Sequence, residues 1–293
     1  MIRIKIPATT ANLGVLFDKG GAALDVFSNV IEIEESDWFS IRVSGGGSED
    51  IPTDKNNLVY RAIEFYYQQT GMQKPGLSIS TYNEIPLSRG LGSSAACIAG
   101  GIFAANELAG VILSEKDIII MAAEMEGHGD NVCAAVAGGF TVFNKNGYEK
   151  IPYGDVGFIL YIPETTLSTK KSRGILPDSY DAATFLKAKE LEKAMLRALH
   201  DNDFEKAGAL MEQDVIHQPY RSRLLPYWDE VIDSARESGA WGTALSGAGP
   251  TMISMCSKEK TDIIIENVKS LIDKRYKLNI IGCEVNPDGI VRG

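Results

Sequence analysis

The sequence is poor in cysteine, which narrows the classes of protein it can represent. Only 4 of the 293 residues are cysteines, and no two of them form a Cys-x-x-Cys pair. Each lies in or beside an apolar run, so we expect buried free thiols in a reducing compartment. Neither a disulfide framework nor a zinc site is expected from this spacing.

Long hydrophobic runs are also missing. No apolar stretch reaches the roughly 18 residues that a membrane-spanning helix needs. The first six residues alternate isoleucine with basic residues, which is typical of a half-buried strand and not of a secretory signal peptide. We therefore expect a soluble protein of the cytoplasm.

Basic residues are outnumbered by acidic ones. The chain has 29 Lys and Arg against 39 Asp and Glu, a net charge of -10. Nucleic-acid-binding domains usually carry a basic face and peripheral membrane anchors a polybasic segment, so neither partner is expected. An acidic chain can still bind a phosphate group, because backbone N–H groups at a helix N-terminus and a few cations are enough.

The hydrophobic pattern predicts an α+β protein in two lobes. Hydrophobic residues make up 44 % and charged residues 23 %, as in ordinary globular domains. Strand-like and helical runs mix without regular alternation, which disfavours a doubly wound sheet. Strands are expected at 2–6, 23–27, 30–34, 38–43, 77–81, 140–143, 156–162, 251–256 and 279–285. Helices are expected at 56–70, 92–108, from Ser114 onward, and at 184–200, 203–215, 228–238 and 258–276. Pro7 is expected to end the first strand, and the lobes are expected to meet near residue 155.

The most informative segment is rich in glycine and serine. Residues 86–96 read Pro-Leu-Ser-Arg-Gly-Leu-Gly-Ser-Ser-Ala-Ala, between an expected strand and an alanine-rich helix. Gly90 and Gly92 let the backbone approach a ligand, and Ser93 and Ser94 open the helix, where free N–H groups favour an anion. The pattern predicts a cradle for a phosphate chain, with serine hydroxyls as donors or as ligands of Mg²⁺. A simple glycine-rich turn with a serine cap would have the same composition. The Walker A and protein-kinase motifs are both missing.

This segment resembles the signature of the GHMP kinases. The resemblance implies two lobes, an N-terminal one like ribosomal protein S5 domain 2 and a ferredoxin-like C-terminal one. Residues 1–155 would form the ATP-binding domain and residues 156–293 the C-terminal domain, with ATP and Mg²⁺ as cofactors. The residues implied in binding ATP are Pro86, Arg89, Gly90, Leu91, Gly92, Ser93, Ser94 and Ala95.

The opening loop is similar to that of one GHMP subfamily, the homoserine kinases. Residues 7–18 carry the similarity, with Val15-Leu16 where the family usually has Pro-Gly. By this resemblance Asn12 and Asp18 would bind the amino-acid part of the substrate. Asp18 can pair with an ammonium group, and Asn12 can both donate and accept hydrogen bonds. Alternatively, the two side chains merely close a turn.

A second similar segment is 124–132, which resembles Glu-Gly-His-Pro-Asp-Asn-Val with Gly129 in place of proline. It implies a glutamate that binds Mg²⁺ together with Ser94. Glu124 and Glu126 are two residues apart on a helix and face different ways, so only one can be the ligand; we favour Glu124. Asn131 would lie near the substrate hydroxyl, and Asp130 stands where some GHMP kinases have a catalytic aspartate. His128 and His217 are expected to be structural.

The second lobe contains two further similar segments. Residues 168–177 resemble Ser-Thr-x-x-x-Arg-x-x-Leu-Pro, and 214–226 resemble a His-x-Pro-Tyr-Arg region. The resemblance implies that Arg173 and Arg221 hold a substrate carboxylate, a geometry that suits guanidinium groups, and that Thr169 assists near the γ-phosphate. Arg223 is expected on the surface. Residues 244–251 resemble a glycine-rich motif that would pack beside the phosphate loop.

Together the resemblance implies ATP-dependent phosphorylation of the L-homoserine side-chain hydroxyl, a step towards threonine, by a homodimer. One alternative is another GHMP kinase acting on a related amino acid, sugar or isoprenoid alcohol; the two arginines favour a carboxylate substrate. The other is a nucleotide-binding relative without catalysis, supported only by the departures at Val15-Leu16 and Gly129. Whether a general base takes part is left open.

Overall fold

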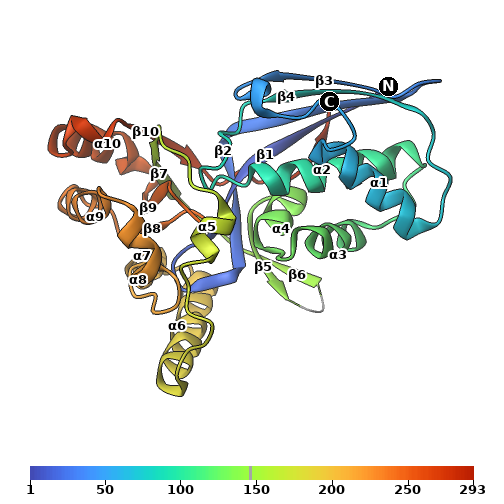
Figure 1. The fold of residues 1–293 in the computed structure, drawn as a ribbon. Helices are drawn as coiled ribbons and strands as arrows, with labels where there is room; N and C mark the ends of the chain where they lie inside the picture. Colours follow the sequence, from blue (N-terminus) through green and yellow to red (C-terminus); the bar gives the residue numbers. More distant parts are fainter. Residues whose placement is uncertain (145–146) are drawn as a thin grey trace.

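Two β-sheets organise the chain (Figure 1). The computed structural model describes residues 1–144 and 147–293. Within them, the first sheet has seven strands: five in the order β11-β1-β2-β4-β3, then β5, which pairs with β2, and β6, which pairs with β5. The second sheet has four strands in the order β10-β7-β9-β8. The first sheet contains β1 (Ile2–Asn12), β2 (Leu16–Glu35), β3 (Ser40–Gly45), β4 (Leu77–Asn83), β5 (Phe140–Asn144), β6 (Gly147–Ile151) and β11 (Val291–Arg292). The second contains β7 (Val156–Pro163), β8 (Gly242–Leu245), β9 (Met252–Ser257) and β10 (Leu278–Glu284). This arrangement confirms the predicted α+β class.

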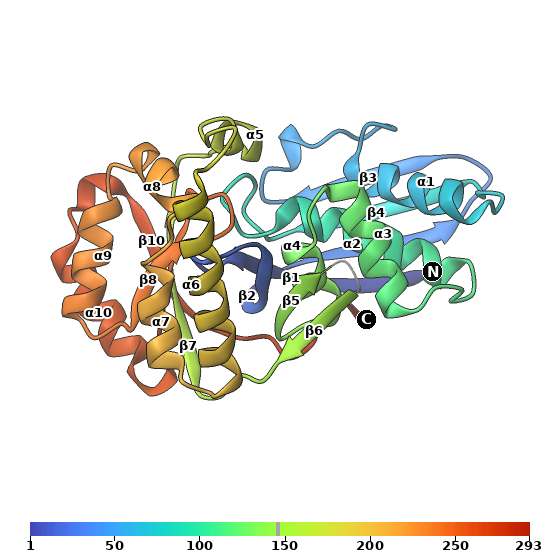
Figure 2. The same ribbon diagram turned by 90° about the horizontal axis from the view of Figure 1, so that it is seen from below.

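Each sheet has its own group of helices. The first group comprises α1 (Leu58–Thr70), α2 (Ser93–Leu108), α3 (Glu115–Glu126) and α4 (Asp130–Ala137). Helices α2 and α4 pack directly on β1 and β2, and α1 and α3 pack against α2. The second group comprises α5 (Thr169–Arg173), α6 (Ala182–His200), α7 (Phe204–Met211), α8 (Gln218–Arg221), α9 (Trp228–Glu237) and α10 (Thr261–Leu271). Figure 2 shows α5 at the boundary between the two groups.

Local sequence explains where the first helices begin and end. The Asn57 side chain accepts hydrogen bonds from two N–H groups in the first turn of α1, and Gly71 ends that helix with φ 68°. Ser114 and Asp117 form a capping box at α3, the helix expected from Ser114 onward. Such caps satisfy N–H and C=O groups that a helix leaves unpaired at its ends.

The first strand is longer than predicted. We expected Pro7 to end it, but β1 continues to Asn12. The register with β2 shifts between Pro7 and Ala8, and such an irregularity accommodates a residue that cannot donate a hydrogen bond. In the same way, β2 is one strand where two short runs were expected. The long β1–β2 ladder therefore runs from the first sheet to the site described below.

The ends of the chain meet in the first sheet. After the second sheet the chain returns, and β11 pairs antiparallel with β1. One hydrophobic core contains buried residues on both sides of residue 155. The division of the chain at that point therefore stays a prediction.

All four cysteines are free thiols, as predicted. Cys133, Cys256 and Cys283 are buried, and Cys97 is partly buried. Burial raises the pKa of Cys97 and of Cys133 to about 12, which keeps these thiols protonated and unreactive at neutral pH. No helix in the described residues is long and apolar enough to span a membrane.

Candidate active site

A cavity of about 350 Å³ lies at the N-terminus of α2 and is lined from both helix groups. One end is formed by the glycine- and serine-rich loop, and the other by side chains from the β1–β2 turn, α4, α5 and α8. All the ATP-binding candidates except one line it: Arg89, Gly90, Leu91, Gly92, Ser93, Ser94 and Ala95. Pro86 lies outside, in a shallower cleft with Phe27 and Pro163.

The backbone of the loop needs glycine at two positions. Gly90 and Gly92 both have φ 74°, a left-handed conformation that side chains disfavour. A Cβ on Gly92 would lie 1.9 Å from Thr9 Oγ1, and one on Gly90 would lie 2.2 Å from the Ser246 carbonyl oxygen. Gly92 is the N-cap of α2 and offers no side-chain cap, so the first N–H groups of the helix are free for an anion.

The loop is anchored on both sides. The Arg89 guanidinium donates hydrogen bonds to the carbonyl oxygens of Leu87 (3.2 Å), Pro163 (2.9 Å) and Glu164 (2.7 Å), so it joins the loop to the end of β7. From the other side, Ser246 Oγ donates to the Gly90 carbonyl at 2.6 Å. This confirms the prediction that the glycine-rich segment at 244–251 packs beside the loop.

Ser94 has a carboxylate neighbour, and it is Glu126. Ser94 Oγ donates a hydrogen bond to Glu126 Oε2 at 3.0 Å, and Glu126 lines the cavity. Glu124 is exposed and does not line it, so our preference between the two glutamates does not fit the geometry. Burial raises the pKa of Glu126, although the charge of His128 and the Ser94 hydroxyl oppose this. A partly buried carboxylate of this kind is stabilised by a nearby cation.

Asp130 is already engaged within the protein. It is 2 % exposed, and its Oδ1 accepts hydrogen bonds from His128 Nδ1 and from the Asn131 N–H, both at 2.8 Å. Burial alone would lower the pKa of His128, but the hydrogen bond and charge of Asp130 outweigh it and raise the pKa. Thr9 Oγ1 donates a hydrogen bond to Asn131 Oδ1 at 2.8 Å. This bond fixes the orientation of the Asn131 amide.

The replacement of proline by Gly129 has a packing reason. A Cβ on Gly129 would lie 2.3 Å from a carbon of the Phe143 ring. The aromatic ring of β5 therefore occupies the space that a larger residue would need, and α4 still begins at Asp130. This departure from the family pattern leaves the cavity-lining Asp130 and Asn131 in place.

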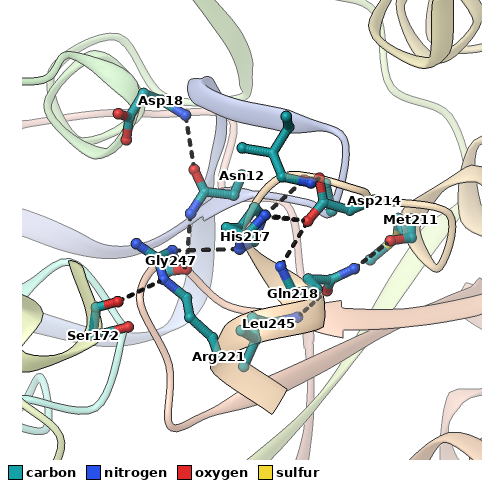
Figure 3. A network of polar contacts seen from close by, with 12 residues as sticks. Asn12, Asp18, Ser172, Met211, Asp214, His217, Gln218, Arg221, Leu245 and Gly247 are labelled. Atoms are coloured by element: carbon teal, nitrogen blue, oxygen red, sulfur yellow. Dashed lines mark hydrogen bonds and ion pairs between the residues drawn. The ribbon is translucent and has the colours of Figure 1, made fainter. Parts of the chain in front are cut away.

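The opposite end of the cavity carries charged groups. Arg173 donates two hydrogen bonds to the Asp18 carboxylate, at 2.7 and 3.2 Å. Asn12 Nδ2 donates to the Gly247 carbonyl at 2.8 Å, and its Oδ1 accepts from the Asp18 N–H at 2.9 Å (Figure 3). Asn12 therefore closes the turn, which was the alternative interpretation of this residue. It also joins the turn to the glycine-rich segment at 244–251. Thr169 lines the cavity at the start of α5.

Arg221 is a buried cation with neutral partners. It is 2 % exposed and forms no ion pair among the residues that the structure describes. Its Nε donates to the Ser172 carbonyl, and its Nη1 contacts His217 Nδ1 and the Gly247 carbonyl. Burial, and then the charge of Arg173, lower its pKa to about 10, so it stays charged at neutral pH. A buried charge that lines a cavity and has no ion-pair partner in this part of the chain favours an anionic ligand. Arg223, in contrast, is exposed as expected.

Sequence reasoning missed one part of the cavity. Beyond the loop it is lined by side chains from the start of α1, the end of β4 and the segment before α1: Asp50, Ile51, Pro52, Asn56, Asn57, Leu58, Val59, Thr81 and Asn83. Apolar groups mixed with amides suit a flat ring that carries polar edges. The one signal available was the Asn56-Asn57 pair directly before a helix, which predicts only a cap.

Comparison with known proteins gives similarity over nearly the whole chain. Residues 57–139 match the model of the GHMP kinases N terminal domain, and residues 195–274 match the GHMP kinases C terminal model. A homoserine kinase of Caldicellulosiruptor bescii is 42 % identical over 281 residues, 93 % of this chain and 89 % of that protein. One from Caldanaerobacter subterraneus is 37 % identical over 297 residues, 98 % of this chain and 94 % of that protein. The crystal structure of a homoserine kinase from Cytophaga hutchinsonii superposes with a TM-score of 0.90 at 29 % identity, covering 100 % of this chain and 97 % of that one.

Proposed function

The chain belongs to the homoserine kinases of the GHMP kinase family, and we propose that its cavity binds ATP at the α2 loop and L-homoserine between Asp18, Arg173 and Arg221. The reaction transfers the γ-phosphoryl group of ATP to the side-chain hydroxyl of L-homoserine and yields O-phospho-L-homoserine. The observation that carries the assignment of the two ends is the charge pattern: free N–H groups at a helix N-terminus at one end, and one carboxylate with two guanidinium groups at the other.

The charged end fits a zwitterionic amino acid. Asp18 would take the ammonium group, and Arg173 and Arg221 would take the carboxylate, the anion that guanidinium groups bind best. Both arginines lie over the ring of Phe17, with guanidinium carbons 5.9 and 5.3 Å from its centroid. This shared ring limits where the two cations can lie. Holding the amino acid at both charged ends would direct its hydroxyl towards the loop.

The phosphate end would use Mg²⁺. Ser94 and Glu126 would hold the ion, since Mg²⁺ takes a few protein oxygens and completes its shell with water and phosphate oxygens. When bound, it neutralises negative charge on the phosphate chain. The free N–H groups of the first turn of α2 would share that task.

Three residues near the reacting groups have distinct proposed roles. The Asn131 amide, fixed by Thr9, would contact the substrate hydroxyl, and the Thr169 hydroxyl would contact the phosphoryl group in transfer. Asp130 would orient Asn131 and His128, because its Oδ1 accepts a hydrogen bond from each. Phosphoryl transfer requires mainly positioning and charge stabilisation, so a strong base is not needed.

ADP release with MgATP tests the assignment. L-Homoserine should be turned over, whereas L-threonine, mevalonate and galactose should be poor substrates, and a Glu126→Gln variant should lose activity with all of them. Turnover of another alcohol at a higher kcat/KM would overturn the assigned amino-acid end and leave the phosphate end standing. The homodimer, the cytoplasmic location and the lack of a nucleic-acid partner stay predictions; light scattering of the purified protein tests the first.

A further inference from the structure

We propose that His217 is a positioning residue that holds the Arg221 guanidinium through the unprotonated Nδ1 of a neutral imidazole, so that protonation of His217 weakens binding of the substrate carboxylate. The inference rests on the proposed function, in which Arg221 binds that carboxylate. It revises the expectation that His217 has only a structural role.

The two hydrogen-bond partners of the ring determine which nitrogen carries the proton. His217 Nε2 lies 2.9 Å from the Gly14 carbonyl oxygen, which can only accept, so Nε2 must be the donor. His217 Nδ1 lies 3.3 Å from Arg221 Nη1, which can only donate, so Nδ1 must be the acceptor. Both contacts are satisfied together by one form alone, the neutral Nε2–H tautomer.

The ring is fixed on its other sides. His217 is completely buried and stacks on Phe17 with 4.9 Å between ring centroids. Asp214 Oδ2 lies 3.5 Å from Nε2 and also accepts from the backbone N–H groups of His217 and Gln218. It therefore orients the segment that precedes α8 and favours the same Nε2–H tautomer. This places Nδ1 towards Arg221 with little freedom.

The charges around His217 oppose one another. Burial has the largest effect on the pKa of His217 and lowers it, and the positive charge of Arg221 lowers it further. The carboxylates of Asp214 and of Asp18 from β2 raise it. Arg173 of α5 faces the same group of residues through Phe17. The net direction is downward from the ordinary value of 6.5, so His217 is neutral at pH 7, which agrees with the tautomer that the contacts require.

Loss of the Nδ1 acceptor would free one edge of the guanidinium. Arg221 Nε is held by the Ser172 carbonyl at 3.3 Å, and Nη1 by His217 Nδ1 and, at 3.4 Å, by the Gly247 carbonyl. A proton on Nδ1 would place an N–H group against an N–H group and add a second positive charge. Arg221 would then shift from the orientation that receives the carboxylate, so the KM for L-homoserine should rise as the pH falls below the pKa of His217.

Two substitutions separate the nitrogen atoms of the ring. In His217→Gln the amide can replace Nε2 and leaves Arg221 without the acceptor, whereas in His217→Asn the amide oxygen can replace Nδ1 and cannot be protonated near neutral pH. We expect His217→Gln to raise the KM for L-homoserine about 10-fold across the pH range, with kcat and the KM for ATP within about 2-fold of wild type. We expect His217→Asn to retain a near-wild-type KM and to lose its rise at acidic pH.

A measurement that does not depend on catalysis, the NMR detection of the His217 tautomer, completes the test. The chain has only 3 histidines, so long-range ¹H–¹⁵N spectra of the full-length protein, assigned with His128→Gln and His200→Gln variants, report the His217 tautomer directly. An Nε2–H signal at neutral pH, together with the KM changes above, supports the proposal. An Nδ1–H tautomer overturns it, as does a fall in kcat with unchanged KM in both variants. If neither variant folds, the wild-type tautomer and the pH profile of the wild-type KM decide. Failure of the proposed function is a separate result, namely a wild-type protein that does not turn over L-homoserine.

Discussion

The Arg173 guanidinium and the Asp18 carboxylate, 155 residues apart in the sequence, are joined by two hydrogen bonds in the lining of the cavity. These are the side chains proposed to hold the opposite charges of the substrate. Without a ligand each neutralises the other, and a zwitterionic amino acid would give each a new partner. The side chains are 38 % and 33 % exposed, and an ion pair this accessible contributes at most about 1 kcal/mol, so a substrate can separate it.

Asp18→Asn should reduce kcat/KM for L-homoserine about 100-fold, because the ammonium group loses its only proposed charged partner while Arg173 keeps its role. The matched comparison is 4-hydroxybutyrate, which has the same carboxylate and hydroxyl but no ammonium group. With that substrate the variant should lie within about 3-fold of wild type. An equal loss for both substrates would show that Asp18 acts by shaping the turn and not by binding the ammonium group.

Glu126→Gln should lower kcat about 100-fold and raise the Mg²⁺ concentration needed for half-maximal activity, because the charged oxygen beside Ser94 is removed. Glu124→Gln is the control from the same helix and should remain within about 2-fold of wild type, since Glu124 is exposed and outside the cavity. Steady-state assays across a Mg²⁺ titration measure both. If Glu124→Gln is the damaging change, the assignment of the cation site is wrong.

The choice between these glutamates could have been made from the sequence by a stricter reading. The buried residues of α3 are Ile118, Ile119, Ala122 and Ala123, and Glu126 follows Ala122 and Ala123 by four and three residues, on the same face of a helix. Glu124 follows Ile120 and Met121 by the same spacings, and residues 118–123 are all apolar, so helical spacing in the sequence alone does not choose between the glutamates. The motif does choose, because in Glu-Gly-His-Pro-Asp-Asn-Val the glutamate directly precedes Gly-His, as Glu126 precedes Gly127 and His128.

Other features could be predicted because they depend only on residues that are close together in the sequence. The phosphate loop, the capping box at Ser114 and the stop at Gly71 each follow from the local chain. The continuation of β1 past Pro7 could not, because it depends on pairing with β2 across a register shift. The same holds for the part of the cavity at Asp50, Thr81 and Asn83, since these residues meet only after the sheet and α1 have assembled.

Gly92→Ala should disrupt the phosphate loop. The new Cβ would lie 1.9 Å from Thr9 Oγ1 and 3.2 Å from Asn131 Oδ1, and the left-handed backbone adds its own strain. We expect a loss of roughly 2–4 kcal/mol in the free energy of unfolding and at least a ~10-fold weaker affinity for ATP.

Gly71→Ala is the matched control for that variant. Gly71 has nearly the same φ, 68°, but nothing lies within 4 Å of the added Cβ. This variant should lose about 1 kcal/mol of the free energy of unfolding, because only the strain of the left-handed backbone is added, and its affinity for ATP should be unchanged. Urea denaturation and ATP titration of both variants separate steric clash from backbone strain; equal destabilisation by the two would contradict the clash.

The buried imidazole of His217 also predicts how stability depends on pH. Its pKa is lowered in the folded protein, chiefly by burial, so in the range below 6.5 the unfolded chain binds the proton more readily than the folded one. Stability from this group is therefore complete above pH ~6.5 and is lost as the pH falls towards the folded pKa, with a slope of at most about 1.4 kcal/mol per pH unit. Urea denaturation at about pH 7.5, 6.5 and 5.5 measures the slope, which should be shallower in His217→Asn than in wild type. His200→Gln, at a half-exposed histidine, should leave the slope unchanged, and an equal slope in all three proteins would mean that His217 does not titrate differently on unfolding.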